Sequence, residues 1–169
     1  MKWLLIAGGI LACCILIPVL IGLVLPVKHS ARVEGLVPAG SGQVWKRITD
    51  AAGFPGWRKG LDRVEVMDTG RWIEISGSNK LPMRIVESLP VTRLVTRIDS
   101  DKLPFGGQWT FRLEPQGGST QVTIIEDGEV YNPFFRFVSR FIMGHHATLN
   151  RYMTDLETSF RQSRRSNKP

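Results

Sequence analysis

Three side chains in the C-terminal half of this 169-residue chain could take part in acid–base chemistry: Glu126, Tyr131 and His145. Carboxyl, phenol and imidazole groups commonly move protons in enzymes, and they also fix the polar end of a ligand in an apolar pocket. His145 falls near the centre of an apolar helical stripe, with Phe141 four residues before it and Leu149 four residues after it. It is therefore either a hydrogen-bonded core histidine or a polar group that faces a cavity.

Motifs for metal, nucleotide and covalent chemistry are missing from the sequence. Its histidines are His29, His145 and His146, and neighbours on a helix point about 100° apart, so none has a partner at a zinc-ligand spacing. Both cysteines, Cys13 and Cys14, lie in an apolar segment. No nucleophile elbow, P-loop or dinucleotide-binding fingerprint occurs. We therefore expect no metal site, no cofactor and no set of catalytic residues.

The excess of positive charge lies mainly at the two ends of the chain. The formal net charge of +7 would suit a nucleic-acid-binding protein. Without Lys2 and the four basic residues from Arg161 onward, however, 17 basic residues remain against 15 acidic ones. We therefore expect no nucleic-acid partner. A hydrophobic fraction of 43% with 22% charged residues also excludes a wholly disordered chain.

The N-terminal segment Trp3–Val27 contains no charged residue. As a helix it would extend roughly 37 Å, more than the roughly 30 Å of a bilayer core. We expect an uncleaved single-pass transmembrane helix that anchors the protein in the cell membrane. A signal peptide is an alternative, as is a lipoprotein, which the sequence Ile10-Leu11-Ala12-Cys13 resembles. Lys2 on one side nearly balances Lys28 and Arg32 on the other, so the orientation stays open.

After residue 30, short runs of alternating apolar and polar residues predict β-strands. A short helix with an N-cap at Ser41 is expected after the first run. Turn residues separate the later runs, for example at 68–70, 77–79 and 103–107. Because this spacing leaves no room for crossover helices, we expect an antiparallel meander. The predicted strands are 31–37, 61–67, 71–76, 83–89, 93–99, 108–114 and 120–130.

A long amphipathic helix is predicted after Asn132-Pro133, since apolar residues then recur every three or four positions as far as Phe160. The remaining tail is polar and basic, and we expect it to be disordered. The predicted organisation is an anchor at 3–27, one α+β domain at 31–162 and a disordered tail at 163–169.

Several local motifs accompany this order of elements: Val44-Trp45, Phe54-Pro55, Trp57, Val64, residues 118–123, Asn132-Pro133, Leu149, Tyr152 and Leu156. Together they resemble the helix-grip fold of the START-like (SRPBCC) superfamily, particularly its polyketide cyclase/dehydrase and lipid-transport branch. The resemblance covers residues 31–162 and implies a curved antiparallel sheet of about seven strands around a long C-terminal helix, with an apolar cavity between them. Members include lipid carriers, hormone receptors and cyclases, so the fold does not imply one activity.

Strand alternation and the helical stripe predict which residues line such a cavity. Trp109 and Phe111 share one inner face, and Glu126 follows Ile124 inward on the next strand, unless a bulge turns it out. The candidate ligand-binding residues are Trp57, Trp72, Trp109, Phe111, Ile124, Glu126, Phe141, His145 and Leu149.

Three functions are compatible with this pattern. The first is a membrane-anchored binding module for a hydrophobic small molecule or lipid. The second is a cyclase- or dehydratase-like enzyme that uses the same cavity, with His145, Glu126 or Tyr131 as acid–base groups. The third is a protein-interaction module whose cavity is filled by its own aromatic side chains. The sequence favours the first, because it offers few convergent polar groups.

Overall fold

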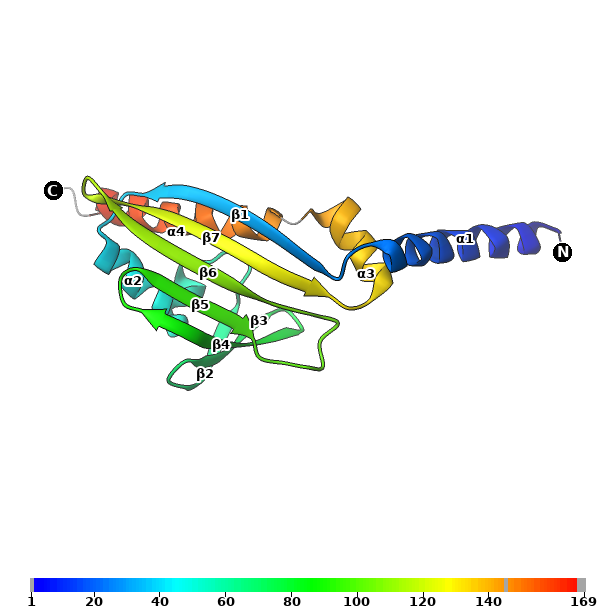
Figure 1. Cartoon of the computed structure of the whole chain (residues 1–169), viewed down its shortest axis with the longest axis horizontal. Helices are drawn as coiled ribbons and strands as arrows, with labels where there is room; N and C mark the ends of the chain where they lie inside the picture. Colours follow the sequence, from blue (N-terminus) through cyan, green and yellow to red (C-terminus); the bar gives the residue numbers. More distant parts are fainter. Residues whose placement is uncertain (1, 145, 167–169) are drawn as a thin grey trace.

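A seven-stranded antiparallel sheet forms the framework of the protein, for which the computed structural model describes residues 2–144 and 146–166 (Figure 1). Its strand order is β1-β7-β6-β5-β4-β3-β2, so β2 to β7 form a meander and β1 closes onto β7. This confirms the α+β class and the antiparallel meander. The strands are β1 Lys28–Val37, β2 Arg63–Asp68, β3 Arg71–Ser76, β4 Asn79–Leu89, β5 Arg93–Ile98, β6 Phe105–Gln116 and β7 Ser119–Val130.

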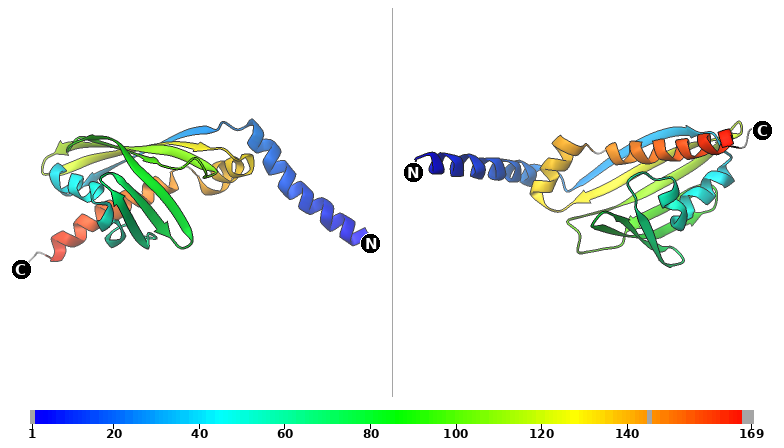
Figure 2. Two further views of the ribbon diagram at one scale, coloured as in Figure 1. Left: turned by 90° about the horizontal axis from the view of Figure 1, so that it is seen from below. Right: turned by 180° about the vertical axis from the view of Figure 1, so that it is seen from behind.

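The helices lie at the ends of the sheet and against one of its faces, and the sheet curves round α4 (Figure 2). A short 3-10 helix, η1, follows α2, and a π-helical turn, η2, follows α3. The helices are α1 Lys2–Val24, α2 Ser41–Thr49, η1 Ala51–Gly56, α3 Pro133–Val138, η2 Ser139–Met143 and α4 Ala147–Ser166.

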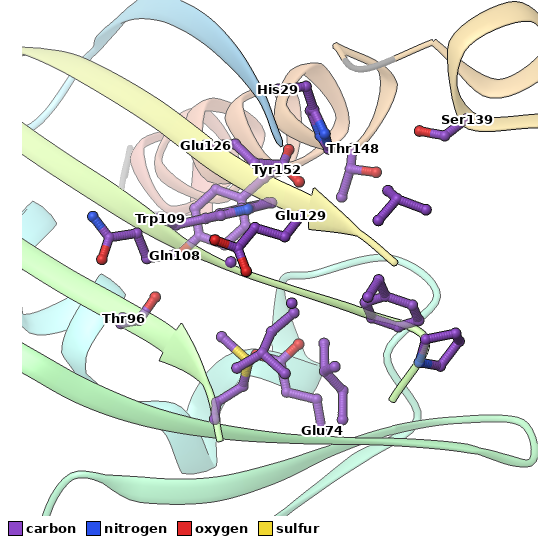
Figure 3. Close-up of a pocket in the computed structure, with 18 of the residues that line it drawn as sticks. His29, Glu74, Thr96, Gln108, Trp109, Glu126, Glu129, Ser139, Thr148 and Tyr152 are labelled. Carbon is purple, nitrogen blue, oxygen red and sulfur yellow. The ribbon is translucent and has the colours of Figure 1, made fainter. Parts of the chain in front are cut away.

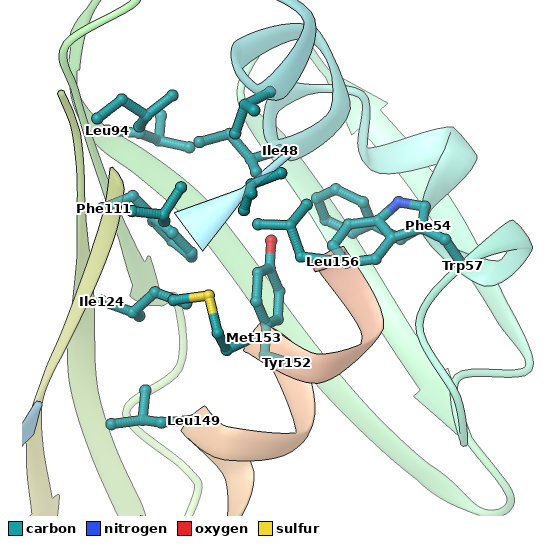
Figure 4. Packing of buried hydrophobic residues seen from close by; sticks show 14 of the residues in the cluster. Ile48, Phe54, Trp57, Leu94, Phe111, Ile124, Leu149, Tyr152, Met153 and Leu156 are labelled. Carbon is teal, nitrogen blue, oxygen red and sulfur yellow. The ribbon is translucent and has the colours of Figure 1, made fainter. Parts of the chain in front are cut away.

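The hydrophobic core lies between α4 and the concave face of the sheet (Figure 4). From α4, Leu149 and Leu156 are fully buried, and they meet Ile124 of β7 and Leu94 of β5 in the same cluster. The i, i+3 and i+4 spacing of the apolar residues of α4 places them on one face, and strand alternation does the same for the sheet. Burial of each large apolar side chain contributes about 1.5–3 kcal/mol.

Three strands begin at least three residues before their predicted starts. Strand β1 begins at Lys28 and pairs there with the last residues of β7. The segment 103–107, which we expected to be a turn, joins β6 from Phe105 onward and pairs with the last residues of β7. Likewise β4 begins at Asn79, so that only Gly77 and Ser78 separate it from β3. The glycines at these positions are typical of turns, but their backbone groups still form ladder hydrogen bonds when a partner strand is present.

The prediction of one continuous C-terminal helix is wrong. The helix is interrupted at Gly144, whose backbone angles are φ 72° and ψ 141°, a left-handed conformation that favours glycine. The chain therefore turns between η2 and α4, and Phe141 lies on a different segment from Leu149. His145 lies outside the described residues. At the other end, α4 continues to Ser166, where the disordered tail was expected, and residues 167–169 lie outside the described residues.

Helix α1 ends at Val24, three residues before the end of the apolar segment, because Pro26 disfavours a helical conformation in the residue that precedes it. The last turn of α1 packs against α3, and Arg136 of α3 makes the polar contacts between them. The Arg136 Nη1 atom donates hydrogen bonds to the carbonyl oxygens of Gly22 (3.0 Å) and Leu25 (3.2 Å), and Nε donates to that of Val130 (2.9 Å).

Within the described part of the chain, no helix combines the length and the apolar character that a membrane crossing requires. The expected transmembrane helix over residues 3–27 is not supported by this structure.

Replacement of Gly144 by alanine tests the helix break. Because a Cβ atom is strained at a φ of 72°, the Gly144→Ala variant should lose about 1–3 kcal/mol of unfolding free energy, measured by urea denaturation of the full chain. The matched control is Gly42→Ala in α2, where an added Cβ meets no atom within 4 Å and φ is not positive. That change should be neutral or stabilising by about 0.4–1 kcal/mol. Equal stability of Gly144→Ala and the native chain would contradict the break.

Candidate functional site: a cavity between the sheet and the C-terminal helices

A cavity of about 480 Å³ lies between the concave face of the sheet and the helical layer (Figure 3). Strands β3 to β7 supply one wall, η1 and α4 supply a second, and α3 and η2 border it at the end near α1. Most of the lining is apolar. Its principal apolar side chains are Trp72, Met83, Ile98, Phe105, Trp109 and Phe111.

The strand register explains why residues from distant parts of the chain meet in this wall. Thr96 of β5 pairs with Trp109 of β6, and Trp109 pairs with Glu126 of β7. Directly paired residues in neighbouring strands point to the same face of a sheet. A continuous row of side chains therefore crosses the sheet under the cavity.

A buried ion pair forms one polar point of the lining. Arg58, which follows η1, donates two hydrogen bonds to the carboxylate of Glu74 on β3, at 2.5 and 2.9 Å. The indole N–H of Trp72 donates to the same carboxylate at 3.1 Å. Burial acts against the charge of Arg58, but the hydrogen bond and the charge of Glu74 outweigh it and raise the pKa of Arg58 above its ordinary value. Both charges are thus compensated within the protein.

Tyr152 is the polar residue that α4 places at the inner end of the cavity. Its ring makes edge contacts with Trp57 and Trp109, at centroid distances of 5.2 and 5.5 Å, and the Arg58 guanidinium lies 5.1 Å from its centroid. Burial raises the pKa of Tyr152 well above its ordinary value, although the charge of Arg58 acts in the opposite direction. The phenol therefore stays protonated at neutral pH. Thr148, one turn earlier on α4, also lines the cavity.

Glu126 is one of three acidic residues that line the cavity from the sheet, together with Glu74 and Glu129. It follows Ile124 on the inner face of β7, as alternation predicted, and its register partner on the other side is Ala31 of β1. Burial raises the pKa of Glu126, while a hydrogen bond from Trp109 and the charge of His146 act in the opposite direction. Figure 3 shows its carboxyl group close to the Trp109 indole.

The expected site residues have four different outcomes. Trp72, Trp109, Phe111 and Glu126 line the cavity. Trp57, Ile124 and Leu149 are instead part of the core, since they lie where α4 and η1 already cover the sheet. Phe141 is 60% exposed, because the break at Gly144 directs η2 away from the sheet. His145 cannot be placed, as it lies outside the described residues.

Sequence reasoning missed Arg58, Glu74, Met83, Thr148 and Tyr152 as lining residues. Two of them had a usable signal. Glu74 lies two residues after Trp72 on the same strand face, and Tyr152 was already part of the apolar helical stripe. Arg58 had none, because it follows an irregular turn whose direction alternation does not define.

Two other expectations concern acid–base groups and metals. Tyr131, a candidate acid–base group, is exposed, donates a hydrogen bond to Glu129 at 2.9 Å and is not among the residues that line the cavity. Among the described residues there is no group of three or more His, Cys, Asp or Glu side chains that could hold a metal ion.

The comparison with family models decides the relationship that the sequence suggested. Residues 28–155 match the model described as polyketide cyclase / dehydrase and lipid transport. The chain belongs to this family. The match begins at the first residue of β1 and ends within α4, so the polyketide cyclase / dehydrase and lipid transport domain comprises the whole sheet and most of the helical layer. This confirms the resemblance to the START-like superfamily. No curated protein matches the chain.

Solved structures with the same fold include members with and without a named activity. A START superfamily protein from Mycobacterium smegmatis has a TM-score of 0.65 and 15% identity, over 79% of this chain and 98% of that one. A norcoclaurine synthase variant from Thalictrum flavum, in complex with a transition-state analogue, has a TM-score of 0.65 and 13% identity, over 83% and 99%. A protein from Thermus thermophilus has a TM-score of 0.64 and 18% identity, over 80% of this chain and 99% of that one. At these identities the likeness shows the fold alone.

Removal of one partner of the buried ion pair tests its role in this family member. Glu74→Leu leaves the charge of Arg58 buried without compensation, so the free energy of unfolding should fall by about 3 kcal/mol. The double variant Arg58→Met, Glu74→Leu removes both charges and should recover most of that loss. Both are measured by urea denaturation of the full chain. If the single variant were as stable as the double variant, the pair would not be electrostatically coupled.

Proposed function

We propose that the protein binds a hydrophobic small molecule or lipid in the cavity between the sheet and its C-terminal helices. The observation that carries this proposal is the apolar cavity itself, since aromatic and aliphatic side chains dominate its lining. Ligand sites are typically concave, about 300–1,000 Å³ in volume, largely apolar and provided with few polar groups. Membership of a family that includes lipid transport supports the same function.

The collapsed-cavity alternative is less well supported. It required Trp57, Trp109 and Phe111 to fill the space between helix and sheet. Trp57 packs into the core, and Trp109 and Phe111 line an open volume of about 480 Å³ without closing it.

A cyclase- or dehydratase-like enzyme is the second candidate, and one observation favours it. Glu126 lines the cavity and its pKa is raised by burial, a combination that is common for acid–base residues. Against it, Arg58 and Glu74 compensate each other and burial keeps Tyr152 protonated, which leaves His29 and Glu129 as the other acid–base groups of the described lining. Binding without catalysis therefore has the better support.

We also propose that the N-terminal segment holds this domain at the cell membrane, as a single-pass anchor. Support comes from the uncharged sequence 3–27 and from large apolar side chains that α1 leaves exposed, among them Leu16, Leu20 and Leu23. A further apolar surface continues from α1 on α3 and η2, where Phe135 and Ile142 are exposed.

Filling the cavity should weaken ligand binding. Thr148 lines the cavity from α4, so the side chain of Thr148→Trp should occupy the space and weaken binding of the neutral dye N-phenyl-1-naphthylamine by at least about tenfold. Binding is measured by dye fluorescence with the full chain in phosphatidylcholine nanodiscs, and empty nanodiscs give the blank.

The matched control is Thr154→Trp on the same helix, at an exposed position outside the cavity lining. It should bind the dye as the native chain does. Equal binding by the native chain and by both variants would place the dye outside the cavity and contradict the proposed site.

The membrane proposal is tested by alkaline carbonate extraction of cell membranes. The full chain should stay in the membrane pellet, because carbonate removes peripheral proteins but leaves apolar segments that are inserted in the bilayer. Intact-mass measurement should also find residues 3–27 in the mature protein. Release into the supernatant, or a mature N-terminus after Val27, would contradict the anchor.

A further inference from the structure

The carboxylates that line the cavity differ in how their charge is compensated. Glu74 forms a two-point ion pair with Arg58. Glu129 lies 3.8 Å from the ammonium group of Lys28 at the rim. Glu126 forms no salt bridge with any residue that the structure describes. The carboxyl of Glu126 is therefore the acidic group of the lining that is held in no ion pair, although the charge of His146 acts on it and the His29 side chain lies near it (Figure 3).

The residues around the Glu126 carboxyl are mainly aromatic and aliphatic. Trp109 pairs with Glu126 across β6 and β7, and the indole of Trp109 packs edge-on against Tyr152. The Trp109 indole lies close to the carboxyl (Figure 3), and its influence lowers the pKa of Glu126, against the effect of burial. The carboxyl can accept hydrogen bonds, whereas the neighbouring walls, such as Phe111 and Met83, are apolar. An uncompensated carboxyl among largely apolar walls suits a molecule with one polar end.

We propose that Glu126 makes the cavity selective for neutral apolar alcohols and excludes carboxylates of the same chain length, an inference that rests on the proposed binding function. A ligand hydroxyl donates a hydrogen bond to the ionised carboxylate and accepts one from the protonated acid, so it matches Glu126 in either state. A fatty carboxylate would bring a second negative charge into a region of low dielectric, where like charges repel strongly. A fatty amine would form an ion pair only after both ions lose their water.

Matched ligands with one twelve-carbon chain test this selectivity. 1-Dodecanol, dodecanoate and dodecylamine each displace N-phenyl-1-naphthylamine from the full chain in phosphatidylcholine nanodiscs, at about pH 8, where a free fatty carboxylate is ionised. The Thr148→Trp variant and empty nanodiscs give the blank. We expect dodecanol to bind at least about tenfold more tightly than dodecanoate. In Glu126→Gln, which keeps the shape and removes the charge, this ratio should fall, because the repulsion is lost while the cost of dehydrating dodecanoate remains.

The control variant is Asp127→Asn, which removes the same charge one residue further along β7. Asp127 is exposed and, by strand alternation, points to the opposite face of the sheet. It should keep the native ratio. A shift in Asp127→Asn as large as that in Glu126→Gln would show a general charge effect and overturn the inference.

The remaining outcomes separate this inference from the proposed function. If the dye binds but dodecanoate equals or exceeds dodecanol, the cavity holds apolar ligands and the selectivity is refuted. If dodecylamine binds most tightly, Glu126 acts as an ion-pair partner and the alcohol class is wrong. If the native chain binds neither dye nor any of the three ligands, the binding function fails and the selectivity fails with it.

Discussion

The packing of α4 against the concave face of the sheet is the interaction on which the rest of the structure depends. Leu149 and Leu156 are fully buried there, and together with Tyr152 they join strands that are far apart in the sequence. Because α4 begins only after the break at Gly144, it covers one part of the inner face. The remaining part is bordered by α3 and η2, which do not fill it. Core and cavity are thus two parts of the same face.

Much of the fold could be predicted from the sequence because it follows from local periodicity. Alternation in strands and turn residues between them defined the meander, and the family match confirms the architecture. The helix break was missed because the apolar stripe continues through Gly144 as if the helix were regular. A glycine within a helical pattern is tolerated at a cost of about 1 kcal/mol, so its backbone angles are decided by packing that the pattern does not contain.

The site was predictable only where alternation alone determines direction. Strand alternation correctly predicted that the side chains of Glu126, Trp109 and Phe111 face the concave side of the sheet. It could not predict which of the residues on that side α4 covers, so Ile124 was expected in the cavity and lies in the core. The ion pair of Arg58 with Glu74 depends on the path of η1, an irregular segment. Contacts of this kind are set by tertiary structure, for which a single sequence holds no periodic signal.

The contact of Arg136 with α1 has a consequence for how the sequence can diverge. Its guanidinium binds the carbonyl oxygens of Gly22 and Leu25, and main-chain oxygens are the same whatever side chain a residue carries. The residues of α1 before Gly22 can therefore change without loss of this contact, whereas Gly22 itself is constrained, because an added Cβ would lie 1.8 Å from the carbonyl oxygen of Pro133. In an alignment of relatives, substitutions should accumulate in the outer part of α1, while positions 22 and 136 stay fixed together.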